Sequence, residues 1–271
     1  MDLRSLFIIK KTRILLRWEF RKEFKLLKEV INIGRKLITT KVVWDETSNF
    51  RKVLIFILVK NFQTAQAIEA LCKKGFGQDV MPLIRTMTEN LIEICYMRLD
   101  KEKRAKAYLD YDYYNVLKNI NELLSFKGEV IDREKLSTRK KELETEWNKV
   151  EKYYLKPKGG VYNHWSCKGL KQMAQEANLA FVYSFLYRLA TEFSHGSRRT
   201  ARDYILGRDK KGIIVELGAS KNLIDKILPT TAMYFISIIS ISNEEYGGGF
   251  DEKINKLKDR LVKHFNYINT K

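Results

Sequence analysis

Apolar residues recur every three or four positions along most of the chain, which is the spacing of amphipathic α-helices. Only 3 prolines and 14 glycines interrupt 271 residues, so few positions break this pattern. The chain is therefore predicted to be all-α. The pattern predicts helices at 51–74, 78–100, 102–126, 133–155, 166–177, 179–195 and 221–245, and a last one from the glycines at 247–249 to Lys271.

The ends of several predicted helices carry capping residues. Asp45 or Ser48 could cap the helix at 51–74, and Ser166 could cap the short helix at 166–177. Pro82 falls in a first turn, where proline is tolerated. The short Gly-Phe-Gly connection at 75–77 predicts an antiparallel pair of helices on either side of it.

One segment departs from the helical period. In "YILGRDKKGIIVELG", residues 204–218, two β-branched runs flank a turn of Gly, Asp and Lys. This arrangement indicates a small β-hairpin.

The N-terminal part of the chain is unusually basic. Residues 1–42 carry 12 Lys and Arg against 4 Asp and Glu, with apolar residues spaced between them. We therefore divide the chain into a basic helical extension, residues 1–45, and one helical domain, residues 46–271. The apolar spacing favours docking of the extension on the body of the protein or on a partner chain, and contact with RNA or a membrane surface is the alternative.

The whole chain is also basic, with 51 Lys and Arg against 33 Asp and Glu and a net charge of +18. Such a surface attracts polyanions, of which nucleic acid is the first candidate and an anionic membrane the second. A generally lysine-rich proteome would give the same balance. RNA is the partner that we expect, and a membrane is not.

Cysteine and histidine usage bears on compartment and cofactors. The three cysteines are scattered without a Cys-x-x-Cys pair, which fits a reducing cytoplasm, and the three isolated histidines have no zinc-type spacing. No uninterrupted apolar run reaches the roughly 18 residues of a membrane span. We expect a cytoplasmic protein without a metal or another cofactor.

The candidate chemistry lies at the end of the helix predicted over 179–195. Arg188 and His195 are seven residues apart, so they share a helix face about 10 Å apart along the axis. They could flank a phosphate, and a second copy related by a two-fold axis could complete the site. Glu192 could pair with Arg188 or orient His195. The same residues would also suit an ordinary solvated helix surface.

Three more arginines follow the histidine. Arg198, Arg199 and Arg202 are suited to clamping phosphates, because a guanidinium donates two parallel hydrogen bonds. These residues are the predicted phosphate-binding group.

A second polar stripe runs through the helix at 78–100. Arg85, Glu89 and Glu93 are spaced four apart among Leu, Ile and Met, so they should face the interior of the bundle. Buried charges need partners, and Arg85 with Glu89 is the obvious ion pair. Glu89 could also reach Arg188. Arg85 and Glu89 would then support the site rather than only the fold.

Two blocks of sequence resemble a known group of proteins. They are "ALCKKGFGQDVMPLIRTMTENLIEI", with its Arg-Thr-x-x-Glu helix, and "HWSCKGLKQMAQEA" followed by "FVYSFLYRLATEFSHGS". Together they resemble an uncharacterised bacterial helical family similar to the HEPN superfamily. The resemblance implies a HEPN-like helical bundle, commonly a homodimer, and many members are ribonucleases with an Arg-x4–6-His motif.

The resemblance assigns roles to particular residues. Arg188 and His195 match that motif at its upper spacing limit, but Leu189 stands where a polar residue often follows the arginine. The implied activity is a metal-independent endoribonuclease of the toxin or antiphage-defence type, controlled by a protein partner. His195 would move protons and Arg188 would stabilise the charged transition state. A non-catalytic helical module that binds nucleic acid or protein is the alternative.

Overall fold

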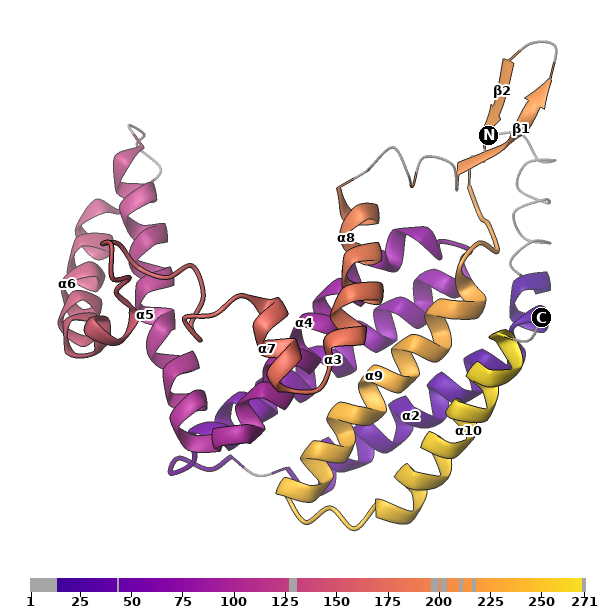
Figure 1. Ribbon diagram of the computed structural model, residues 1–271, viewed down its shortest axis with the longest axis horizontal. Coiled ribbons are helices and arrows are strands. Elements are labelled where there is room, and N and C mark those ends of the chain that lie inside the picture. Colours follow the sequence, from indigo (N-terminus) through magenta and orange to yellow (C-terminus); the bar gives the residue numbers. More distant parts are fainter. Residues whose placement is uncertain are drawn as a thin grey trace.

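The computed structural model describes residues 14–42, 44–126, 131–195, 200, 204–209, 212–215 and 218–269 (Figure 1). Helices dominate these residues, which confirms the all-α class. The elements are α2 (Arg21–Thr40), α3 (Asn49–Lys73), η1 (Gln78–Val80), α4 (Met81–Met97), η2 (Arg98–Asp100), α5 (Lys101–Ser125), α6 (Arg133–Val150), η3 (Glu151–Tyr154), α7 (Leu170–Glu176), η4 (Val182–Tyr187), α8 (Arg188–Ser194), β1 (Ile205–Asp209), β2 (Gly212–Val215), α9 (Ile224–Glu245) and α10 (Asp251–Asn269). Strands β1 and β2 pair antiparallel at the position where the sequence indicates a hairpin.

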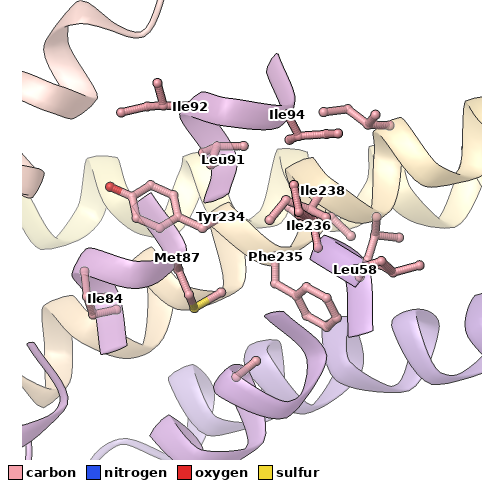
Figure 2. Close-up of a cluster of buried hydrophobic side chains, with 14 of the residues drawn as sticks. Leu58, Ile84, Met87, Leu91, Ile92, Ile94, Tyr234, Phe235, Ile236 and Ile238 are labelled. Atoms are coloured by element: carbon pink, nitrogen blue, oxygen red, sulfur yellow. The ribbon is translucent and has the colours of Figure 1, made fainter. Parts of the chain in front are cut away.

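Helix α9 is the centre of the bundle. It packs against α2, α3, α4 and α10, and Phe235, Ile236 and Ile238 along it are fully buried. Figure 2 shows these α9 side chains gathered with those of α4 and with Leu58 of α3. The core therefore joins helices from both ends of the sequence.

Helix α2, from the basic N-terminal segment, belongs to this core. It packs on α9, α3 and α10, and its Leu27, Val30 and Leu37 are fully buried. Gly34 permits a close approach to α9, because a Cβ at this position would lie 2.7 Å from Cζ of Phe235. The apolar side of α2 thus docks on the body of the protein.

Two of the three predicted helix ends are confirmed. The Ser48 side chain accepts a hydrogen bond from the backbone N–H of Arg51 at 3.2 Å and caps α3, and Pro82 lies in the first turn of α4. The prediction for Ser166 is wrong, because α7 begins at Leu170 with Gly169 at its N-cap. The Ser166 hydroxyl instead accepts from the backbone N–H of Lys168.

Helices α5 and α6 form an arm that projects from the bundle (Figure 1). The predicted helix at 133–155 divides into α6 and the 3-10 helix η3, and α6 packs on α5 and η3. Aromatic rings fill the arm: the Trp147 ring lies 5.2 Å from that of Tyr114 and 5.3 Å from that of Tyr154. The arm therefore has a small core of its own.

Within the described residues, α3 and α9 are long and apolar enough to cross a membrane, judged by length and composition. In the most apolar window of α9, 72% of the residues are buried inside the protein, and in that of α3 44% are buried. Central helices of a soluble bundle have the same properties, so the finding carries little weight alone.

Candidate functional site

The segment that carries the predicted Arg–His motif is not a regular α-helix. Residues Val182–Tyr187 form the π-helix η4, which continues into α8, and His195 is the C-cap of α8. A π-helical turn holds more residues than an α-helical turn and shifts the faces of the residues that follow it. Both η4 and α8 pack on α4, so side chains from the two segments meet.

Four side chains from α4, η4 and α8 form one hydrogen-bonded group, which we call the Arg85–His195 cluster: Arg85, Glu89, Tyr187 and His195. Arg85 is its hub. Its Nε donates to Oε1 of Glu89 at 3.1 Å, its Nη2 donates to the Tyr187 hydroxyl at 3.1 Å, and its Nη1 lies 3.3 Å from Nε2 of His195. The Tyr187 hydroxyl donates to Oε1 of Glu89 at 3.0 Å and closes the network.

The contact between Arg85 and His195 defines the tautomer of the imidazole. A guanidinium has N–H donors and no acceptor, so Nε2 of His195 must accept the hydrogen bond. The ring is then neutral with its proton on Nδ1. The lone pair of Nε2 faces the positive charge of Arg85, and a ligand that takes over the Arg85 donor would release that lone pair for proton transfer.

The cluster is only partly shielded from solvent. The side chain of Arg85 is 29% exposed and that of Glu89 is 36% exposed, whereas His195 lies on the exposed surface. Burial, and next the charge of Glu89, raises the pKa of Tyr187. The Tyr187 hydroxyl therefore stays protonated at neutral pH and acts as a fixed donor to Glu89.

The structure regroups the residues predicted for the site. The expected Arg85–Glu89 ion pair is confirmed. Arg188 is exposed and forms no ion pair among the described residues, so it pairs with neither Glu89 nor Glu192. The arginine in contact with His195 is Arg85, which is 110 positions away in the sequence.

The remaining residues predicted for the site are Glu192 and the three arginines that follow His195. Glu192 is half-buried on α8, one turn before His195. The predicted phosphate clamps Arg198, Arg199 and Arg202 lie outside the described residues. Their role stays a prediction from their position just after His195 in the sequence.

Sequence reasoning missed Tyr187. Its hydroxyl bridges Arg85 and Glu89, and its ring lies 5.2 Å below the Arg85 guanidinium. The residue directly precedes Arg188, but a regular helix would not predict that it faces α4. Tyr187 is the last residue of the π-helix η4, which has no obvious sequence signal.

A second polar group surrounds Glu93, the third residue of the predicted stripe. The Trp165 indole donates to Oε1 of Glu93 at 3.3 Å, and Nε2 of His164 lies 3.5 Å from the same oxygen. Nδ1 of His164 lies 2.9 Å from the Ser166 hydroxyl and accepts from the backbone N–H of Ser166 at 3.3 Å. These contacts fix the loop before α7 beside a cavity of about 490 Å³ that Tyr108 and Glu93 help to line.

No group of three or more His, Cys, Asp or Glu suited to a metal ion occurs in the part of the chain that the structure describes. The Arg85–His195 cluster combines an anion-binding guanidinium with a neutral imidazole. Such a pair can hold a phosphate and move a proton beside it.

The fold and this cluster define an all-α protein with an arginine–histidine site at the junction of three helices. The chain belongs to DUF5677, a family of unknown function whose model matches residues 51–213. The match includes all four residues of the cluster and leaves out α2, α9 and α10. No curated protein and no solved structure matches the chain.

Proposed function

We propose that the protein is a metal-independent endoribonuclease whose active site is the Arg85–His195 cluster. The observation that carries the proposal is the 3.3 Å contact between Nη1 of Arg85 and Nε2 of His195 at an exposed surface. It places an anion-binding group directly beside a neutral proton acceptor. The resemblance to HEPN ribonucleases points to the same reaction.

The reaction uses the groups of the cluster in order. A phosphate of RNA takes the Nη1 donor of Arg85 and frees Nε2 of His195, which removes the proton of the adjacent 2′-hydroxyl. The 2′-oxygen forms a bond to phosphorus, and the bond from phosphorus to the 5′-oxygen breaks as that oxygen takes a proton from water. The products are a 2′,3′-cyclic phosphate and a 5′-hydroxyl end.

Arg85 is suited to stabilising the charged transition state. Glu89 and Tyr187 already hold two of its donor groups, so the guanidinium is oriented before substrate binds. Preorganised donors cost no rearrangement at the moment of reaction. In this proposal Arg85 takes the role that the sequence motif gives to Arg188.

The remaining arginines bind phosphates of the RNA backbone next to the cleaved bond. Arg188 is exposed on α8, and Arg198, Arg199 and Arg202 follow it in the sequence, so they are candidates for neighbouring phosphates. A homodimer, a regulatory protein partner, a cytoplasmic location and a role as a toxin or in antiphage defence belong to the same proposal and come from the HEPN resemblance.

The test is cleavage of labelled RNA in the presence of EDTA, with a DNA of the same sequence as control. We expect cleavage of RNA alone, with cyclic phosphate ends. His195→Ala should lower the rate by roughly 10²- to 10⁴-fold. Arg85→Lys should lower it by about 10²-fold or more, because lysine keeps the charge and loses the fork of donors.

Lys256→Ala is a matched control, since it removes one exposed charge from α10, far from the cluster in sequence. Equal cleavage by wild type and His195→Ala would refute the assignment of the base. RNA binding by the wild type without cleavage would instead support the non-catalytic binding module.

A further inference from the structure

The outer face of α2 carries an unbalanced positive charge. Six Lys and Arg of α2 are exposed, and none of them forms an ion pair with an acid among the described residues. The acids of α2 have their contacts elsewhere: Oε1 of Glu23 lies 3.0 Å from Nε2 of His264, and Glu29 forms an ion pair with Arg260. With Arg17 of the preceding turn, we call these residues the cationic face: Arg17, Arg21, Lys22, Lys25, Lys28, Arg35 and Lys36.

The cationic face extends along most of α2. From Arg17 to Lys28 its members recur at three- and four-residue spacing, Arg35 and Lys36 follow about two turns later, and the segment from Arg21 to Lys36 covers about 22 Å of helix. The opposite side of α2 is buried against α9, so this helix cannot rotate to hide the cations. Helix α6 differs from α2, because its exposed cations alternate with Glu134, Glu142 and Glu146. Glu142 and Glu146 form ion pairs with cations of the same helix.

Exposed apolar side chains lie at the N-terminal end of the same face. Ile14 is 67% exposed, Leu15 51% and Trp18 71%. We call these three residues the apolar tip. The hydrogen bonds from Phe20 N–H to the Leu16 carbonyl and from Phe24 N–H to the Phe20 carbonyl carry the helix across the join between the tip and α2.

We propose that the cationic face and the apolar tip dock the protein on the surface of an anionic lipid bilayer. Lys and Arg beside a bilayer are attracted to acidic headgroups, and an exposed Trp with aliphatic neighbours enters the headgroup region. The protein would lie on the membrane with α2 parallel to it.

RNA is the competing occupant, and the arrangement fits it less well. Platforms for single strands place aromatic side chains between the cations. The exposed face of α2 between Arg21 and Lys36 has no aromatic residue, and Trp18, between Arg17 and Arg21, is the one exposed aromatic side chain of the cationic face and the apolar tip. The proposal does not depend on the Arg85–His195 cluster or on its activity.

The experiment is sedimentation of the full chain with vesicles of phosphatidylcholine alone and of phosphatidylcholine mixed equally with phosphatidylglycerol. We expect binding to the anionic vesicles only, and weakening by salt. The triple variant Lys22→Glu, Lys25→Glu, Lys28→Glu should weaken binding by on the order of 10²-fold or more. Leu15→Ser with Trp18→Ser should also weaken it, by about 10-fold or more.

The matched control is Lys118→Glu, Lys135→Glu, Lys141→Glu, which makes the same change of charge at exposed positions of α5 and α6. It should bind vesicles at least tenfold more tightly than the α2 variant, and circular dichroism should show that both are folded. Equal loss in the two triple variants would overturn the proposal, since net charge alone would explain binding. Loss of RNA binding in the α2 variant, with no vesicle binding by the wild type, would assign the face to RNA and also overturn it.

Discussion

At the scale of single residues, the hydroxyl of Tyr187 is the sharpest test of how the cluster works. It bridges Arg85 and Glu89, so Tyr187→Phe removes two hydrogen bonds and leaves the ring in place. We expect the RNA cleavage rate to fall by about 10-fold or more, because Arg85 loses an orienting partner. The free energy of unfolding should fall by only about 1 kcal/mol.

Tyr183→Phe is the matched control for this prediction. The Tyr183 ring stacks on Tyr187 with centroids 5.1 Å apart, and its hydroxyl is not part of the cluster. Its cleavage rate should match that of the wild type. If both variants cut RNA at the wild-type rate, the Tyr187 hydroxyl has no part in the reaction.

The buried thiol of Cys72 links stability to alkaline pH. Burial raises the pKa of Cys72 from 9.0 to about 12, so the folded protein keeps the proton that the unfolded chain releases above pH 9. The stabilising contribution is complete below pH 9 and is lost as the pH rises towards 12, by up to about 1.4 kcal/mol per pH unit. Urea unfolding of wild type and Cys72→Ala between pH 8 and 11 measures it.

At pH 8 the variant should be less stable than the wild type, because it loses a buried sulfur atom. Its free energy of unfolding should nevertheless fall less steeply above pH 9 than that of the wild type. Parallel curves would mean that Cys72 does not carry this dependence.

At the scale of elements, the contact of α2 with α9 depends on one missing side chain. Gly34→Ala would place a Cβ 2.7 Å from Cζ of Phe235 and 3.2 Å from Cδ1 of Ile239. Overpacking of this kind costs about 1–3 kcal/mol, and the better helix propensity of alanine offsets up to about 1 kcal/mol. We expect a net loss of stability in urea unfolding. The exposed Asn32→Ala on the same helix isolates the propensity gain and should not destabilise.

The helices themselves were predictable from sequence, because apolar spacing reports which side of each helix is buried. Ser48 and Pro82 also marked their helix starts correctly. The site was only half predictable. The Arg85–Glu89 pair is local, four residues apart on one helix, whereas the Arg85–His195 contact needs α4 packed on α8, which is distant in the sequence. The spacing of apolar residues indicates neither which helix packs against which nor where a π-helical turn occurs.

At the scale of the whole molecule, the proposed RNA cleavage and the proposed membrane docking belong to two different surfaces. The cluster lies on α4, η4 and α8, within the part of the chain that the family model matches. The cationic face lies on α2, outside that part. Catalysis and docking should therefore be separable by mutation: His195→Ala should bind vesicles as the wild type does, and the α2 triple variant should cut short RNA in solution.

The arm formed by α5 and α6 should unfold separately from the bundle. Helix α6 packs on α5 and η3, and Trp147 joins Tyr114 and Tyr154 in a core that α9 does not enter. Trp147→Ala should cost this core about 3–5 kcal/mol, which is enough to open a local unit. Hydrogen exchange should show lost protection in α6 and the distal half of α5, with α9 still protected. Lys141→Ala on the exposed side of α6 should change neither. If α9 lost protection together with α6, the arm and the bundle would be one cooperative unit, and the aromatic core of the arm would be stabilising the whole fold.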